Sequence, residues 1–342
     1  MAERVVLLGH GSGGLLSHEL VGRVFIKHLG NPILSEMEDA STIPLADEQG
    51  RLVGTPVMTT DSYVIRPIFF PGGDIGKLSV CGTVNDLAMR GAVPLYLSAG
   101  FILEEGLPLA DLERVVASMA VTAQRAEVRI VAGDTKVVEH GSADRLFINT
   151  TGIGLVPPGV HISASLARPG DVVLVNGAVG DHGLAIMTQR EGLQFDSPLE
   201  SDCTPLNSLV AAMLAACPQI HVLRDPTRGG LATTLNELAQ QSAVSIEIHE
   251  AAVPVHEPVR AASEILGLDP LYVANEGKLI VILSEKDAPL VFEAMRAHPD
   301  GRETALIGRV TAERPGRVVL RTTLGTRRLL DMLAGEQLPR IC

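Results

Sequence analysis

Residues 73 to 89 read GDIGKLSVCGTVNDLAM and combine an apolar helix with a carboxylate inside it. The apolar residues from Gly76 to Met89 recur at helical spacing, which predicts a helix packed against a core. Asp86 lies with Asn85 on this helix, between Val84 and Leu87. An ionised carboxylate in apolar surroundings is costly unless it is paired or bound to a cation. The segment therefore predicts both a packed α/β domain and a binding site.

Three more aspartates stand at breaks between predicted elements. Asp61 follows the strand pattern of residues 57–60, Asp134 follows 130–133, and Asp225 follows 222–224 and is expected to begin a helix. One such aspartate is commonly a helix cap or a turn residue. Together with Asp86, all four predict Mg²⁺ held by carboxylates and by the phosphates of a substrate.

Other residues near these aspartates suit a nucleotide. In the segment 225–230, Asp-Pro-Thr-Arg-Gly-Gly, the glycines would expose N–H groups at the positive end of a helix. Lys136 follows the predicted metal ligand Asp134, and Glu276 lies in a short loop before a strand. The predicted nucleotide-binding residues are Asp61, Asn85, Asp86, Asp134, Thr135, Asp225, Thr227, Gly229 and Gly230.

Three glycine-rich segments admit other interpretations. Residues 9–14 fit G-x-G-x-x-G, which is typical of a nicotinamide-dependent oxidoreductase but equally of a flexible loop over phosphates. Nothing later in the chain favours the oxidoreductase. Residues 72–79 resemble a P-loop, but the spacing is one residue short and Leu78 replaces the required hydroxyl residue. Residues 177–183 favour a tight connection over a second phosphate loop.

The order of elements predicts an α/β fold with two domains. Strand patterns occur at 4–8, 56–60, 93–103, 129–132 and 146–155, and again at 172–176, 220–223, 244–248, 279–283 and 317–321. Helical patterns lie between them at 76–89, after 108, from about 183, at 209–217 and after 230. Proline and glycine around 157–171 mark a boundary. We expect domains at 1–156 and 157–334, followed by a tail at 335–342.

Composition narrows the class of protein. The chain has 342 residues, 46% apolar and 20% charged, with a net charge of −12. Such an acidic chain is a poor partner for nucleic acids or anionic membranes. The apolar part of the N-terminus is too short for a signal peptide, and no apolar stretch could span a bilayer. Four cysteines without a C-x-x-C pair favour a cytoplasmic enzyme with reduced thiols.

The chain ends in Pro339-Arg340-Ile341-Cys342. Pro339 disfavours a helix, so residues 335–342 are expected to form a mobile tail. A thiol at its end can be loaded with a small group and carried into a pocket and out again. The other cysteines, Cys81, Cys203 and Cys217, lie in or beside apolar segments and are expected to pack.

Taken together, these motifs resemble those of the hydrogenase maturation family HypE, the carbamoyl dehydratases, over essentially the whole chain. The matching segments are 9–14, 61–62, 73–89, 133–136, 225–230, 275–278 and 339–342. The internal motifs also occur in a wider superfamily of ATP-using enzymes that includes aminoimidazole ribonucleotide synthetase, selenophosphate synthetase and thiamine-monophosphate kinase. The terminal Pro-Arg-Ile-Cys is the feature that points to the hydrogenase family.

The resemblance implies a specific reaction. A carbamoyltransferase partner, HypF, would load Cys342 as an S-carboxamide, and this protein would remove water with ATP to give an S-cyanide. The cyanide would pass to a HypC–HypD scaffold and become a ligand of the iron of [NiFe]-hydrogenase. The family fold implies two α/β domains, with the N-terminal domains pairing into a β-barrel across a homodimer.

Roles follow for four catalytic candidates. Cys342 would carry the substrate, Lys136 would stabilise the transferring phosphoryl group, and Glu276 would take the N–H proton, with His140 as the other candidate base. Three alternatives stay open. They are another ATP-dependent enzyme of the superfamily, the oxidoreductase, and a thiol carrier that presents the group without catalysis. Selenophosphate synthetase would require a reactive cysteine near the N-terminal glycine loop, and residues 1–35 contain none.

Overall fold

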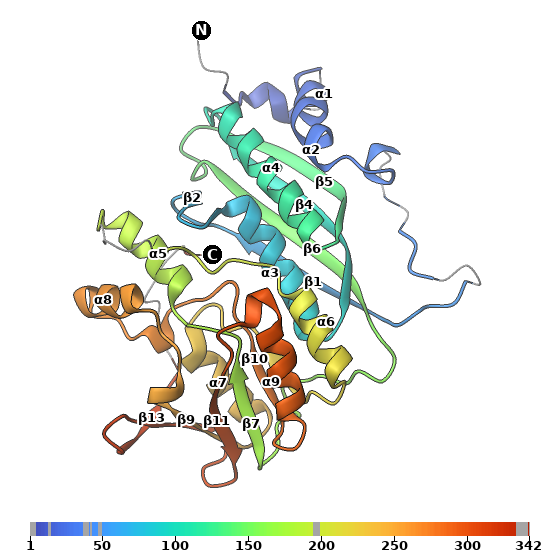
Figure 1. Ribbon diagram of the computed structural model, residues 1–342. Coiled ribbons are helices and arrows are strands. Elements are labelled where there is room, and N and C mark those ends of the chain that lie inside the picture. Colours follow the sequence, from blue (N-terminus) through green and yellow to red (C-terminus); the bar gives the residue numbers. More distant parts are fainter. Residues whose placement is uncertain are drawn as a thin grey trace.

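The computed structural model describes residues 5–12, 15–36, 41, 43–46, 50–193, 199–332 and 341. It is elongated, with two α/β lobes placed end to end (Figure 1). The N-terminal lobe contains a four-stranded sheet and the C-terminal lobe a seven-stranded sheet. This confirms the mixed α/β fold class.

The N-terminal sheet has the order β1-β6-β4-β5. Its strands are β1 (Thr55–Tyr63), β4 (Val93–Glu104), β5 (Arg129–Val138) and β6 (Leu146–Val156). Only β4 and β5 pair in parallel; the other neighbours are antiparallel. Helices α3 (Ile75–Met89) and α4 (Leu109–Arg125) cover one face, as the sequence pattern predicts. A small hairpin of β2 (Phe69–Phe70) and β3 (Gly73–Asp74) precedes α3, and Asp74 caps that helix by accepting the N–H groups of Gly76 and Lys77.

Among the described residues, no helix covers the other face of this sheet (Figure 1). Ser62, Asn149, Gly100 and Asp134 form one row across the four strands. Because side chains alternate along a strand, this row points away from α3 and α4. Hydrogen bonds connect polar side chains along this row; for example, Asn149 Nδ2 donates one to Ser62 Oγ at 3.1 Å. Met58, on the same face, is 70% exposed.

The described part of the predicted strand at 4–8 is reduced to a single bridge at Val5, and short helical turns begin at Leu8. They are η1 (Leu8–Gly11), α1 (Leu15–Leu20), the π-helical η2 (Val21–Ile26), α2 (Lys27–Leu29) and η3 (Leu34–Glu36). Val6 donates to the carbonyl of Leu107, and the described pairing of this segment is one bridge between Val5 and Pro108. Phe25 packs on Phe101 of β4 with ring centroids 4.8 Å apart.

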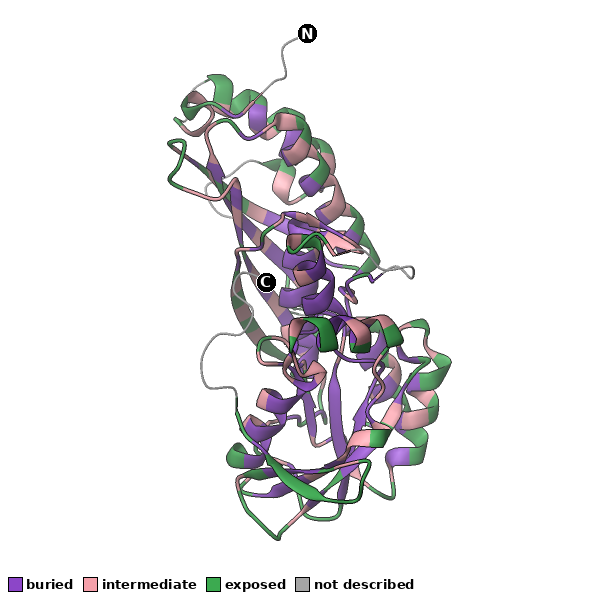
Figure 2. Ribbon diagram, turned by 90° about the vertical axis from the view of Figure 1, so that its left-hand side faces the viewer, coloured by how far each residue is buried: buried purple, intermediate pink, exposed green. Residues whose placement is uncertain are grey.

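The C-terminal sheet has the order β13-β12-β9-β11-β7-β10-β8. Its strands are β7 (Asp171–Val175), β8 (Val222–Arg224), β9 (Ser245–His249), β10 (Ile280–Ser284), β11 (Ala305–Thr311), β12 (Arg317–Arg321) and β13 (Arg327–Leu330). The helices are α5 (Asp181–Arg190), α6 (Asn207–Ala216), α7 (Gly230–Gln241), α8 (Glu257–Leu266) and α9 (Ala288–Ala297), with single turns η4 (Glu250–Ala252), η5 (Pro270–Tyr272) and η6 (Pro299–Gly301). All five residues of β7 are buried, in the centre of the lobe (Figure 2).

The two lobes share part of their core. Phe70 and Ile75 of the N-terminal lobe belong to the same apolar cluster as Leu184 of α5 and Val273. We propose the domain boundaries 1–156 and 157–334, because one sheet ends at Val156 and the connection to β7 at Asp171 contains no strand or helix. A shared core holds the lobes together around any site between them.

Two boundaries differ from the prediction at functional residues. β1 continues to Tyr63 and β5 continues to Val138, so Asp61 and Asp134 lie inside strands rather than after them. The cause is pairing: Asp61 faces Thr150 of β6, and Asp134 faces Gly100 of β4. Ladder pairing overrides the low strand propensity of aspartate.

Candidate active site

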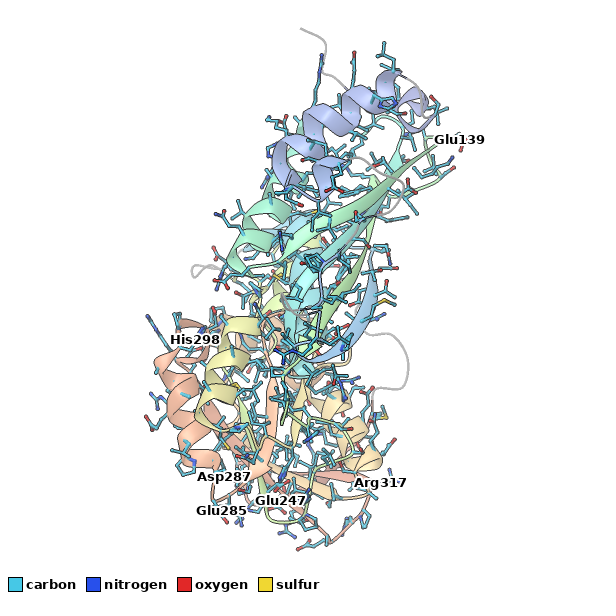
Figure 3. All side chains as sticks on the ribbon, turned by 90° about the vertical axis from the view of Figure 1, so that its right-hand side faces the viewer. Glu139, Glu247, Glu285, Asp287, His298 and Arg317 are labelled. Atoms are coloured by element: carbon cyan, nitrogen blue, oxygen red, sulfur yellow. The ribbon has the colours of Figure 1, made fainter. Side chains whose placement is uncertain are left out.

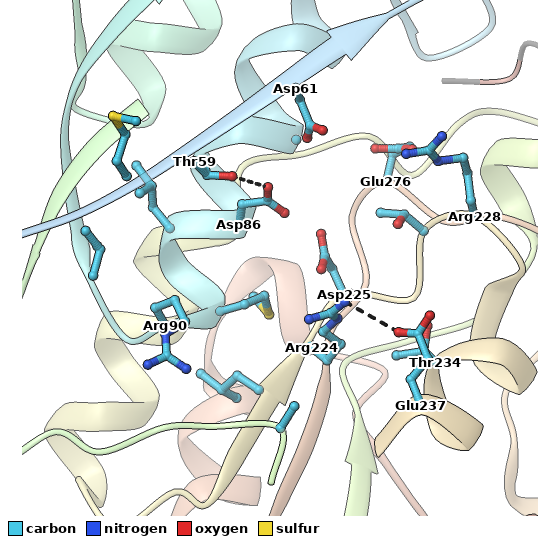
Figure 4. A pocket seen from close by; sticks show the side chains of 18 of the residues that line it. Thr59, Asp61, Asp86, Arg90, Arg224, Asp225, Arg228, Thr234, Glu237 and Glu276 are labelled. Atoms are coloured by element: carbon cyan, nitrogen blue, oxygen red, sulfur yellow. Dashed lines mark hydrogen bonds and ion pairs between the residues drawn. The ribbon is translucent and has the colours of Figure 1, made fainter. Parts of the chain in front are cut away.

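A cavity of about 490 Å³ lies between the two domains. Its N-terminal wall comes from β1 and α3, and its C-terminal wall comes from β8, the loop 225–228, α7 and Glu276 (Figure 4). This volume is in the range of small-molecule sites in proteins. The cavity joins motifs that are far apart in the sequence.

Asp61 and Asp86 form the N-terminal wall. Thr59, Asp61 and Tyr63 share the helix-facing side of β1 because side chains alternate along a strand. Thr59 Oγ1 donates a hydrogen bond to Asp86 Oδ2 at 2.7 Å, and Tyr63 OH donates to Asp61 Oδ2 at 3.3 Å. Strand and helix thus hold two carboxylates toward one space.

Asp225 and Glu276 face them from the C-terminal domain (Figure 4). Asp225 follows β8 directly. The loop that carries Glu276 is fixed by Asp202, whose carboxylate accepts the N–H of Glu276 at 3.0 Å and that of Gly277 at 3.2 Å. Lys278 Nζ lies 3.2 Å from the same carboxylate. Glu276 is therefore held by its backbone, which leaves its side chain to the cavity.

Asn85 supports this loop and does not line the cavity. Its Nδ2 donates to the carbonyls of Thr204 at 3.1 Å and Glu276 at 3.3 Å, and its Oδ1 accepts the N–H of Leu206 at 2.7 Å. The side chain is 2% exposed. The prediction that Asn85 binds the nucleotide directly is therefore not supported, because its polar atoms are taken by backbone groups. It joins α3 to the loop of Glu276.

The four carboxyl groups have raised pKa values. Burial is the main cause for Asp61 and for Asp86, and the charge of Asp61 adds to the effect on Asp86. Burial and the neighbouring Asp86 raise the pKa of Asp225 to about 7. Burial, then the nearby Cys203 and Asp202, hold the pKa of Glu276 well above its ordinary value. Such a cluster favours a bound cation or a held proton.

Three arginines also line the cavity: Arg90, Arg224 and Arg228. Arg224 Nη2 lies 3.4 Å from Glu237 Oε2. Guanidinium groups suit phosphate oxygens. The sequence pattern did not single out Arg90 or Arg224. Arg228 belongs to the segment 225–230, and its position next to Thr227 is the feature of the sequence that could have identified it.

Known proteins are similar to this chain both in sequence and in three-dimensional structure. Residues 38–156 match the AIR synthase related protein, N-terminal domain, and residues 168–321 match the AIR synthase related protein, C-terminal domain. The carbamoyl dehydratase HypE of Azotobacter vinelandii is 57% identical over 333 residues, covering 97% of this chain and 96% of that protein. The chain belongs to the HypE family of carbamoyl dehydratases.

Solved HypE structures share the fold. One, a HypE in complex with ATP, has a TM-score of 0.94 and 53% identity, and the match covers 98% of this chain and 99% of that one. Another, from a HypE–HypF complex, has a TM-score of 0.80 and 48% identity over 94% of this chain and all of that one. Membership of HypE excludes the oxidoreductase interpretation of residues 9–14, of which the structure describes 9–12.

One chain brings together three of the four predicted metal ligands. Asp61, Asp86 and Asp225 line the cavity, but Asp134 points from the helix-free face of the N-terminal sheet. With Thr135, it borders a second cavity of about 440 Å³, beneath the N-terminal helical turns. Among the described residues, no three carboxylate, imidazole or thiolate groups could hold a metal ion unaided.

Lys136 and His140 also lie away from the cavity. Lys136 pairs with Ile102 in register and so faces the helix-free side. His140 is 86% exposed beside Glu104 and follows Glu139, which Figure 3 shows at the far end of the N-terminal domain. This placement does not support His140 as the base of the cavity. Cys342 lies outside the described residues.

Thr227 lines the cavity, whereas the glycines after it shape the turn before α7. Gly230 donates its N–H to the carbonyl of Thr227 at 2.9 Å. Both Gly229 and Gly230 have positive φ, and a Cβ on Gly230 would lie 2.6 Å from the carbonyl oxygen of Val273. The turn uses this N–H, so the structure does not support its predicted role toward phosphate, and the role of Gly230 stays a prediction.

Replacing Asp225 tests the electrostatics of the cavity in metal-free protein. Its pKa of about 7 is above the ordinary value of 3.8. A raised pKa in the folded state stabilises the fold at low pH, and this contribution is lost as the pH rises through 7. With divalent cations chelated, Asp225→Asn should raise the free energy of unfolding at pH 8 by on the order of 3 kcal/mol, and by little at pH 4.

Urea denaturation at both pH values measures this difference. Asp331→Asn is the control, because the Asp331 side chain is 72% exposed and pairs with the exposed Arg317. Equal stability of Asp225→Asn and the parent chain at pH 8 would contradict the repulsive cluster.

Proposed function

We propose that this chain removes water from a carbamoyl group on Cys342, using ATP and leaving cyanide on the sulfur. The observation that carries the proposal is that a HypE sequence places four carboxyl groups around one cavity between its domains. The structure of a HypE with ATP, similar over 98% of this chain, supports ATP as the co-substrate.

The reaction balances with one ATP. The thiocarbamate R–S–CO–NH₂ and ATP give the thiocyanate R–S–CN, ADP, phosphate and a proton. Transfer of the phosphoryl group to the carboxamide oxygen, with loss of one N–H proton, gives R–S–C(=NH)–O–phosphate, and loss of phosphate together with the second N–H proton forms the C≡N bond. Glu276 is the proposed proton acceptor. Its raised pKa means that it holds a proton strongly once it has accepted one.

Asp61, Asp86 and Asp225 would hold Mg²⁺ together with phosphate oxygens. Their mutual repulsion and burial fit a cation, and the ion would neutralise charge on the transferring phosphoryl group. Arg90, Arg224 and Arg228 would bind other phosphate oxygens. The backbone-held loop of Glu276 would keep the base fixed while the substrate arrives.

We propose a homodimer, because it could bring together predicted site residues that lie far apart in one chain. The helix-free face of the N-terminal sheet is an unpaired layer, and two such sheets can close into a barrel. If β1 of one copy pairs with β5 of the other, the partner's Asp134 would come near the part of β1 that carries Ser62, which borders the cavity. We propose that Asp134 and Lys136 act in the cavity of the partner subunit.

The proposed partners follow from the solved HypE–HypF complex and from the chemistry. HypF would load Cys342, and a HypC–HypD scaffold would receive the cyanide. Within the described residues, no helix has the length and apolar character to cross a membrane. The buried free thiols of Cys81, Cys203 and Cys217 agree with a reducing compartment, and we propose the cytoplasm.

Intact mass and peptide mapping test the reaction. After incubation with HypF, carbamoyl phosphate and ATP, one carbamoyl adduct should appear on the C-terminal peptide and then lose the mass of water. Chelation of divalent cations should stop the water loss. Cys342→Ala should fold but accept no adduct. An adduct on Cys81, Cys203 or Cys217, or water loss without ATP, would show that the proposal is wrong.

Subunit mixing tests whether Lys136 acts across the dimer. Lys136→Ala and Cys342→Ala should each be inactive, but co-refolded mixtures should regain about a quarter of parent activity, from one complete site in each heterodimer. Glu276→Gln mixed with Cys342→Ala is the matched control and should stay inactive, because Glu276 and the buried Ile341 belong to one chain. If the first mixture is also inactive, Lys136 does not act in trans.

A further inference from the structure

His182 is a fully buried histidine outside the cavity. It is the second residue of α5 and lies within the segment 177–183, whose sequence favours a simple connection. The ring packs edge-on against Phe70 of the N-terminal domain, with centroids 5.6 Å apart at 90°. Elements from both domains therefore fix the ring, although no step of the proposed reaction uses it.

Both ring nitrogens of His182 have a partner. Nδ1 lies 2.7 Å from Ser201 Oγ, and Nε2 lies 2.6 Å from the carbonyl oxygen of Ile341. A carbonyl can only accept, so Nε2 carries the proton, and a neutral ring then accepts the hydroxyl proton of Ser201 at Nδ1. Burial lowers the pKa of His182, in agreement with a neutral ring. Ser201 Oγ in turn accepts the N–H of Cys203 at 3.1 Å.

Ile341 is the residue before Cys342, and it is 4% exposed. Its side chain belongs to the same apolar cluster as Leu199, Cys203 and Val273. A residue this close to a chain end is ordinarily exposed. Here a buried side chain and a backbone hydrogen bond hold the penultimate residue between the domains.

A series of hydrogen bonds connects Ile341 with the loop of Glu276, the proposed base. His182 binds Ser201, Ser201 binds the backbone of Cys203, and Asp202 between them accepts the N–H of Glu276 at 3.0 Å. Consecutive Cα atoms are about 3.8 Å apart, so anchoring Ile341 limits where the Cys342 sulfur can reach.

We propose that His182 is a positioning residue that latches the chain end through the carbonyl of Ile341 and so seats Cys342 at the cavity. Any side chain at position 341 presents the same carbonyl, so the bond fixes the depth of insertion of the main chain. The apolar cluster then selects a side chain such as isoleucine. The purpose of the latch rests on the proposed function; its existence does not.

Thiol labelling measures the latch without catalysis. In native buffer, iodoacetamide should modify Cys342 of His182→Leu about five to ten times faster than Cys342 of the parent chain, as loss of one hydrogen bond predicts. His182→Gln should stay close to the parent rate, because its amide can place an N–H near Nε2. Peptide mapping separates Cys342 from the three buried cysteines.

Two further variants keep the test decisive. Ile341→Ala weakens the same contact from the chain end and should also speed labelling of Cys342, so the test remains available if His182→Leu does not fold. In the double variant the increase should be smaller than the two single effects combined. His221→Leu is the control for general loosening, since it removes a contact with the buried Asp171 at 2.8 Å, away from the chain end. It should leave the labelling of Cys342 unchanged.

Single-turnover dehydration links the latch to the reaction. His182→Leu should slow water loss from carbamoylated Cys342 by a similar factor, with ATP affinity and loading by HypF unchanged. Parent-rate labelling in folded His182→Leu, while the parent chain dehydrates its adduct, would overturn the latch. Faster labelling in His182→Leu with no dehydration by the parent chain would overturn the proposed function and leave the latch in place.

Discussion

Repulsion among carboxyl groups at the domain junction is the constraint on which the site depends. Asp61 and Asp86 come from one domain, and Asp225 and Glu276 come from the other. Burial raises the pKa of each, and neighbouring carboxylates raise the pKa values of Asp86, Asp225 and Glu276 further, so the cluster is more favourable when it holds a cation or protons. The fold must therefore hold the two domains together against this repulsion.

Polar cross-links and a common core provide that restraint. Asn85 on α3 binds the backbone at Thr204, Leu206 and Glu276, and so connects the helix of one domain to the loops of the other. Each of these bonds gives a backbone group at the domain junction a side-chain partner. Asp202 fixes the next residues of the same loop. The position of Glu276 is consequently set by contacts that leave its carboxyl free.

The sequence predicts most elements of the fold, because apolar periodicity at 76–89, 93–103 and 146–155 reflects burial on one or both faces. It also finds Asp61, Asp86, Asp225 and Glu276. It does not predict that β5 continues through Asp134, since ladder pairing with β4 decides that. Nor can it place Asp134 and Asp61 on opposite faces of one sheet, because strand register and order are long-range properties.

The same limit applies to His182, whose partners lie at residues 70, 201 and 341. A latch on a carrier end must also be weak, since the thiol has to leave for its loading partner. One neutral hydrogen bond contributes about 1 kcal/mol and a buried isoleucine about 2–3 kcal/mol. Fixing two or three residues of a chain end costs about 1–2 kcal/mol each. With two residues fixed at about 1 kcal/mol each, these contributions leave about 1–2 kcal/mol in favour of the bound end, so the latch predominates yet can be released, and a change on the sulfur could shift the balance.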